Sequence, residues 1–96
     1  MNRAEFEAEL VREGYEVREG EIKPNVHREA HAHAFDARLL VLDGSVTLVF
    51  GHDRITYGPG DSCGVPAGTM HAEHTEADGG VIVSGRPEVP QKPAAQ

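Results

Sequence analysis

Residues 60–71 read GDSCGVPAGTMH, and the spacing of glycine, proline and histidine in this stretch decides the fold. Gly58-Pro59-Gly60 turns the chain into a strand. Pro66-Ala67-Gly68 predicts a tight turn, because proline fixes φ and glycine adopts positive φ without strain. The chain then returns with His71 facing inward. At this chain's own composition the pattern arises by chance in about one case in 250, so we interpret it as a specific strand–turn–strand unit.

A second pair of histidines, His31 and His33, lies upstream on a strand predicted over residues 29–35. Residues two apart in a strand share a face and lie about 6.5–7 Å apart, so both imidazoles could converge on one metal ion. Imidazole suits zinc, copper, iron and nickel. A His-x-His pair alone is weak evidence, because a chain with this histidine content contains one by chance about one time in three.

Short apolar segments separated by glycine and proline fill most of the chain and predict β-structure. The β signals begin with Tyr15, Val17 and Ile22, where Gly20 and Pro24 are expected breaks. Several short strands at this spacing are typical of a sandwich or barrel. The strands are predicted over residues 29–35, 37–43, 45–50, 54–57, 61–65, 69–75 and 80–85.

The N-terminal segment predicts a helix. Asn2 can cap it and Glu5 completes a capping box, Phe6 and Leu10 share one face, and Gly14 is a natural stop. A helix this short and charged persists only if it packs on something else. We therefore expect an N-terminal helix at residues 1–14 packed on the barrel, a barrel at residues 15–86, and a disordered, proline-containing tail at residues 87–96.

Composition excludes several classes of partner. The chain has 96 residues, with nine Lys and Arg against sixteen Asp and Glu, a net charge of −7. Such a chain repels a phosphate backbone, so we expect no nucleic-acid partner. Cys63 is the one cysteine, so no internal disulfide framework is possible. The first residues are too charged for a signal peptide and no apolar run approaches about 20 residues, so we expect a cytoplasmic protein with no membrane partner.

Two stretches of the sequence resemble the cupin motifs. Residues 60–75 resemble the second motif, G-x5-P-x-G-x2-H-x3-N, with Thr75 where asparagine is usual. Residues 31–44 resemble the first motif, H-x-H-x3-4-E-x6-G, and the two stand in the expected order. The resemblance to a small single-domain cupin implies an all-β fold, a jelly-roll-like β-barrel with a short N-terminal helix, and a metal near its open end.

The resemblance implies one divalent metal ion held by His31, His33 and His71, with Fe, Ni, Zn or Mn as candidates. Some cupin dioxygenases use a three-histidine site. The simplest interpretation is therefore three histidines with water completing the coordination shell.

The glutamate of the first motif is missing, because Ala37 or Arg38 occupies its position. Asp36 is adjacent and is the first candidate to replace it. Glu29 and Glu73 are the other candidates, since they share strand parity with His31 and His71 respectively.

Further residues are candidates for a ligand pocket beside the histidines. Arg38 could hold a substrate carboxylate, or pair with Asp36. His27 shares the face of His31 only if the strand is unbroken. The candidate pocket residues are Asp36, Arg38, Glu73 and His27.

Two classes of function fit these residues. The first is a metal-dependent enzyme, dioxygenase- or isomerase-like, that acts on a small organic molecule. The alternative is a non-catalytic small-ligand binding or sensor module that resembles the sensor domains of AraC-type regulators. Fold resemblance cannot separate them, because one fold hosts many functions.

We also expect a homodimer. The run Leu39-Leu40-Val41-Leu42 is apolar on both faces of its strand. If Ala37 faces the interior, alternate leucines face outward and form an apolar patch that a monomer seldom leaves open. The N-terminal segment could cover part of this patch, either from its own chain or by exchange with a neighbour, and a chain whose helix folds over that face could stay monomeric. A two-fold partner would bury the same patch on both subunits. The expected patch consists of Leu40, Leu42, Val46 and Leu48.

Overall fold

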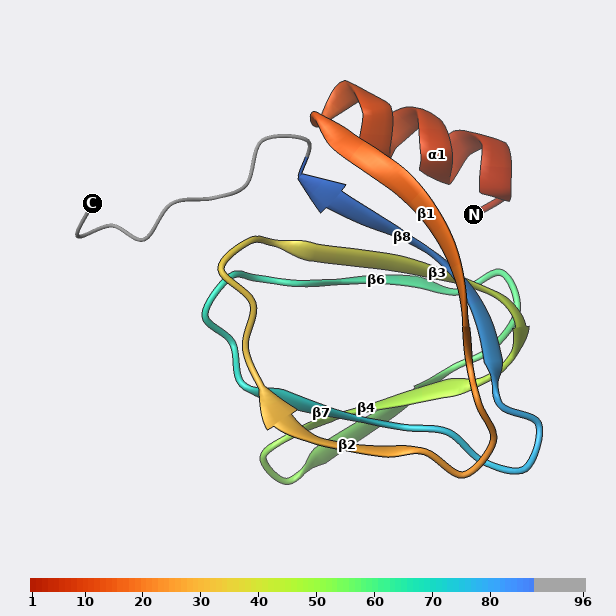
Figure 1. The fold of residues 1–96 in the computed structure, drawn as a ribbon, viewed down its shortest axis with the longest axis vertical. Coiled ribbons are helices and arrows are strands. Elements are labelled where there is room, and N and C mark those ends of the chain that lie inside the picture. The colour runs from red at the N-terminus through yellow and green to blue at the C-terminus, as the bar shows by residue number, and fades with distance from the viewer. Residues whose placement is uncertain (88–96) are drawn as a thin grey trace.

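Two four-stranded antiparallel sheets face each other across a shared interior, with one helix outside them (Figure 1). The computed structural model describes residues 1–87, so most of the tail expected at residues 87–96 lies outside the described residues. The elements are α1 Arg3–Arg12, β1 Tyr15–Ile22, β2 His27–His31, β3 Ala37–Gly44, β4 Val46–Phe50, β5 Asp53–Tyr57, β6 Ser62–Val65, β7 His71–His74 and β8 Gly80–Pro87.

Successive strands lie in opposite sheets, as in a jelly roll, except for the hairpin of β4 and β5. One sheet has the order β1-β8-β3-β6 and the other β2-β7-β4-β5, so neighbours in space are mostly distant in sequence. The sheets are not joined into a closed barrel. The predicted class, an all-β jelly-roll-like fold with a short N-terminal helix, is confirmed.

Several strand limits differ from the expected ones. Gly20 does not break β1, because every residue from Tyr15 to Ile22 pairs with β8. The strand expected at residues 29–35 is β2, which ends at His31. The segment after His31 leaves the sheet and crosses to β3 in the opposite one.

An apolar core fills much of the interior between the sheets. Leu39 and Val41 of β3 face it, as predicted. Val46 and Leu48 face it too and are fully buried, so the outward orientation expected for them is wrong. The physical reason is topological: β4 lies in the sheet opposite β3, so its apolar face turns toward β3.

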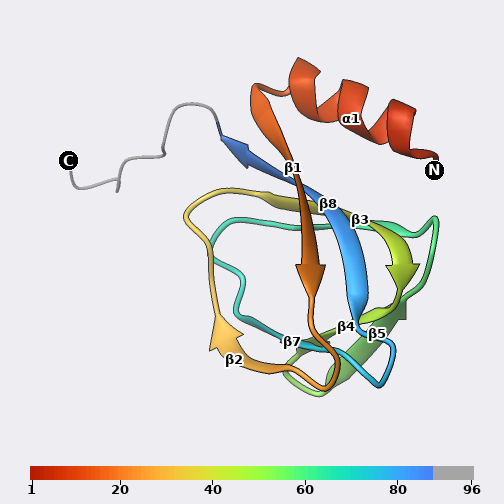
Figure 2. The ribbon, with the colours of Figure 1, turned by 45° about the vertical axis from the view of Figure 1, so that its right-hand side comes forward.

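The outer face of the β1-β8-β3-β6 sheet is covered by α1, which lies over β1 and β8 (Figure 2). Phe6 and Leu10 of the helix pack against Leu40 and Val83, and all four side chains are buried. The chain's own helix therefore covers the outward leucine from which we expected a dimer contact. Within residues 1–87, no helix is long and apolar enough to cross a bilayer.

Gly85 in β8 allows this close approach. A Cβ atom at this position would collide with the Tyr15 ring and lie 2.9 Å from a Leu10 methyl carbon. Val83 faces the helix on the same side of β8, while Ser84 lines the interior on the other. A single strand thus separates the helix contact from the pocket described below.

We expect Phe6→Ala and Leu10→Ala each to lower the free energy of unfolding by about 3 kcal/mol, because each removes a fully buried side chain and leaves a cavity. Urea denaturation at equilibrium measures the change. Val11→Ala is the matched control, since Val11 lies on the same helix and is 64% exposed. A loss in the Phe6 or Leu10 variants no larger than in this control would contradict the packing.

Candidate metal centre

A β-bulge in the pairing of β2 with β7 determines which side chains reach the interior. His27 pairs with His74 and Arg28 with Glu73, but His31 then pairs with His71, so β2 carries one extra residue. Facing residues of an antiparallel ladder share a face. Arg28 and His31, three apart in sequence, therefore both join the inner face, which a regular strand would forbid.

Four potential ligands meet at this face: His31, His33, His71 and Glu73. One ligand atom from each lies within 4.8 Å of all the others. Donors at about 2.1 Å from a single ion lie roughly 3 to 4 Å apart, so small movements bring the four atoms onto one centre. Nε2 of His31 and Nε2 of His71 lie 3.9 and 3.8 Å from the same oxygen, Oε1 of Glu73.

Backbone carbonyls fix the orientation of two imidazoles. Nδ1 of His31 lies 2.8 Å from the carbonyl oxygen of Glu29, and Nδ1 of His71 lies 3.0 Å from that of Thr69. A carbonyl only accepts, so each Nδ1 carries the proton and donates it. In the neutral ring Nε2 then keeps its lone pair, and both Nε2 atoms face Glu73. Metal-binding histidines are held in this way by a second hydrogen bond, so the donor set fits a metal ion.

His33 stands on the segment between β2 and β3, and no regular strand positions it. Its ring centroid lies 5.1 Å from that of His31 and 5.3 Å from that of His71. Burial lowers the pKa of His33, and the neighbouring His31 and His71 lower it further. The ring therefore stays neutral at pH 7, the form in which histidine binds a metal.

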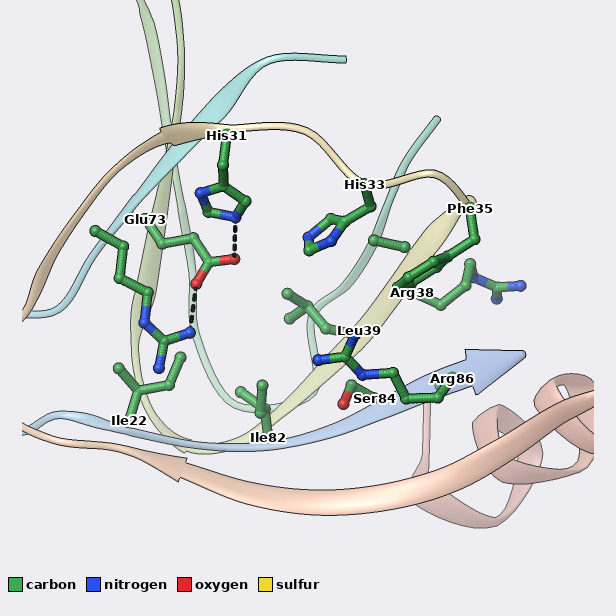
Figure 3. A pocket seen from close by; sticks show the side chains of 13 residues that line it. Ile22, His31, His33, Phe35, Arg38, Leu39, Glu73, Ile82, Ser84 and Arg86 are labelled. Atoms are coloured by element: carbon green, nitrogen blue, oxygen red, sulfur yellow. Dashed lines mark hydrogen bonds and ion pairs between the residues drawn. The ribbon is translucent and has the colours of Figure 1, made fainter. Parts of the chain in front are cut away.

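A cavity of about 140 Å³ adjoins the cluster (Figure 3). Ile22, Leu39 and Ile82 form an apolar part of its wall. Glu73 is the only carboxylate that lines it among residues 1–87, and Arg28 holds Oε2 of Glu73 at 3.0 Å. The cavity therefore has an apolar wall beside the polar histidine and glutamate side chains.

Of the three carboxylates considered as a fourth ligand, only Glu73 lies in the cluster. Asp36 accepts a hydrogen bond from the Ala67 amide at 2.8 Å and is absent from the cluster. Glu29 contributes its backbone carbonyl to His31, and its side chain is exposed. Parity counting placed Glu29 on the inner face, but the bulge reverses the parity of the residues before it. Glu73 is the carboxylate that the structure brings to the histidines.

Arg38 lines the pocket with part of its side chain, but its guanidinium is not free for a substrate. It bonds Glu13, the C-cap residue of α1, at 2.6 Å and Glu9 within α1 at 3.1 Å, and it does not pair with Asp36. Alternation along β3 explains this, because Ala37 and Leu39 face the interior and Arg38 faces the helix.

His27 is not part of the pocket. Its ring packs against His74, with centroids 4.5 Å apart, and the two residues face each other across the ladder before the bulge. We expected His27 to share the face of His31 only in a regular strand, and the bulge between Arg28 and His31 makes β2 irregular.

Two arginines of the pocket went unnoticed in the sequence, Arg28 and Arg86. Arg28 has the wrong parity relative to His31 in a regular strand, so only the bulge reveals it. Arg86 lies near the end of β8, outside both motifs. No signal in the motifs points to either residue.

The two facing sheets and the interior cluster define a small jelly-roll protein with a histidine-rich site. A family model described as the cupin domain matches residues 15–84. The chain therefore belongs to the cupin domain family, which confirms the resemblance of the two motifs. No curated protein sequence matches the chain.

Solved structures with this fold share about a fifth of their residues with the chain. A cupin-2 domain containing protein from Shewanella frigidimarina has a TM-score of 0.67 at 20% identity, over 78% of this chain and 72% of its own. The DMSP lyase DddQ from Ruegeria pomeroyi has a TM-score of 0.68 at 21% identity, over 82% of this chain and 41% of its own. The polyketide cyclase RemF from Streptomyces resistomycificus has a TM-score of 0.66 at 22% identity, over 81% of this chain and 63% of its own. Such similarity establishes the fold alone.

We expect His33 in the metal-free protein to titrate below the ordinary histidine pKa of about 6.5. Because the unfolded chain then binds the proton more readily, this residue makes the folded state less stable as pH falls from about 6.5 to the folded-state pKa. NMR titration of the ring protons measures the pKa, and urea denaturation of wild type and His33→Asn measures the stability. A His33 pKa at or above 6.5 would contradict the expectation.

Proposed function

We propose that this chain binds one divalent metal ion through His31, His33, His71 and Glu73 and acts as a metal-dependent enzyme on a small organic molecule in the adjoining cavity. The observation that carries the proposal is the fixed orientation of two imidazoles, whose Nδ1 atoms donate to backbone carbonyls and whose Nε2 atoms face Glu73.

Three imidazole nitrogens and one carboxylate oxygen suit Fe, Ni, Zn or Mn. When bound, such an ion supplies Lewis acidity to an oxygen atom of the ligand. The glutamate comes from β7 in place of the missing glutamate of the first motif, so the site needs no ligand at Ala37.

The chain's own residues prepare this site. Arg28 holds Oε2 of Glu73, which leaves Oε1 toward the imidazoles. The guanidinium thus orients the carboxylate. Ile22 and Ile82 form an apolar wall against which a ligand beside the cluster can pack.

The comparisons support a reaction on a small organic molecule. Two structures with this fold are named for reactions, one a DMSP lyase and the other a polyketide cyclase. Neither name describes an oxidation. The candidate reactions for this chain are therefore lyase-like and isomerase-like as well as dioxygenase-like.

A non-catalytic binding or sensor module is the second candidate, and one observation favours it. Among the described residues, Glu73 is the only carboxylate of the cavity, and it is paired with Arg28. The cavity therefore offers no separate carboxylate for general acid–base catalysis. Ligand binding without metal-dependent turnover would support this candidate over the enzyme.

We expect metal-replete protein to contain close to one Fe, Ni, Zn or Mn ion per chain by elemental analysis. Titration of the metal-free protein with Zn(II) and Ni(II) should show affinity lowered about 100-fold by His31→Ala and at least about tenfold by Glu73→Gln, which removes the charge but keeps the shape. Binding should weaken below about pH 6, because protonated histidine cannot ligate.

His27→Ala is the matched control for this experiment. It removes a histidine of the same strand whose ring packs on His74 outside the cluster, and it should leave the affinity unchanged. Equal losses in the His27 and His31 variants, or protein that binds no metal, would refute the assignment.

The homodimer stays a prediction, although Leu40 no longer supports it. The edge strand β5 carries an exposed isoleucine, Ile55, and edge strands favour pairing with another chain. Light scattering during size exclusion at micromolar concentration should give twice the chain mass of 10.4 kDa. A mass of one chain would contradict a dimer.

A further inference from the structure

We propose that the cavity selects ligands with a carboxylate group and that Arg86 binds this carboxylate. The inference rests on the proposed function only in placing the ligand beside the histidine cluster. Arg86 comes from β8, in the sheet opposite β2 and β7, so it faces the cluster across the cavity (Figure 3).

Arg86 is an exposed residue that lines the cavity, and one aromatic contact orients its side chain there. Its guanidinium carbon lies 5.5 Å from the centroid of the Phe35 ring, a cation–π contact. Figure 3 shows the side chain extending past Ser84 toward Leu39. A guanidinium stacked on an aromatic ring is already oriented, so binding an anion orders little more of the side chain.

Among residues 1–87, charge pairing leaves the guanidinium of Arg86 without a carboxylate partner. The chain carries an excess of carboxylates, and Arg28 and Arg38, the other two arginines of the cavity, each pair with at least one of them. Within residues 1–87 no ion pair forms at Arg86. Its neighbour across the ladder, Glu16, bonds Arg18 instead. Arg86 is thus the cavity's uncompensated positive charge among the described residues.

The cavity's dimensions and lining define the ligand class. Arg86 stands on one side and the histidines with Glu73 on the other, and Leu39 and Ile82 line the space between them. A cavity of about 150 Å³ holds benzene, and this one measures about 140 Å³. The arrangement fits a short carboxylic acid of roughly six to eight non-hydrogen atoms, with a hydroxyl or keto oxygen directed to the cluster. A planar carboxylate matches the guanidinium fork in a two-bond contact.

The experiment uses 3-hydroxybutyrate and its neutral isostere 3-hydroxybutyramide as probes. Both are titrated by NMR into the full chain, once metal-free and once with Zn(II). We expect the amide to bind at least tenfold more weakly than the acid, and Arg86→Gln to weaken the acid at least tenfold while leaving the amide and the zinc content unchanged.

Arg54→Gln is the matched control, because it removes the same charge from an exposed residue of β5 that does not line the cavity. It should bind the acid as the wild type does. Equal affinity for acid and amide, equal losses in the two arginine variants, or displacement of the acid by equimolar inorganic phosphate would overturn the proposal. Acid binding that depends on Arg86 in protein unable to bind zinc would refute the metal site and leave this inference standing.

Discussion

The pairing of β2 with β7 is the constraint on which the site depends. Facing residues of an antiparallel ladder must share a face, so the position of one extra residue decides which side chains meet. Here the bulge brings Arg28 and His31 to the interior together, opposite Glu73 and His71. The same pairing supplies three of the four candidate metal ligands and the guanidinium that orients the carboxylate. His33, on the segment that follows, completes the cluster without belonging to either strand.

Burial on both faces of β3 divides the molecule into two apolar layers with different roles. Leu39 and Val41 join the interior core, and Leu40 packs beneath α1. Arg38 follows the outward alternation and pairs with the helix, so a residue that seemed suited to ligand binding instead anchors α1. The helix occupies the surface for which the sequence left two covers open, a second subunit or the N-terminal segment.

The local spacing of residues predicted the fold class, the three histidines and the faces of β3, because each depends on turns and alternation within one segment. Parity counting failed at Glu29 and overlooked Arg28, since it assumes a regular strand and a bulge leaves no mark in composition. The orientation of Val46 and Leu48 depends on which sheet β4 joins, and the position of Arg86 depends on pairing between β8 and β3. Such long-range relations are set by tertiary structure.

Only the strand β8 separates the helix contact from the cavity, and this has a thermodynamic consequence. Gly85 and Val83 face the helix while Ser84 and Arg86 face the cavity, so one strand belongs to both layers. A ligand held on the inner side of β8 binds only the form in which that strand is in place, and mass action then shifts unfolding to higher temperature. Melting temperature is thus a readout through which a library of small acids could be sorted before any reaction is known.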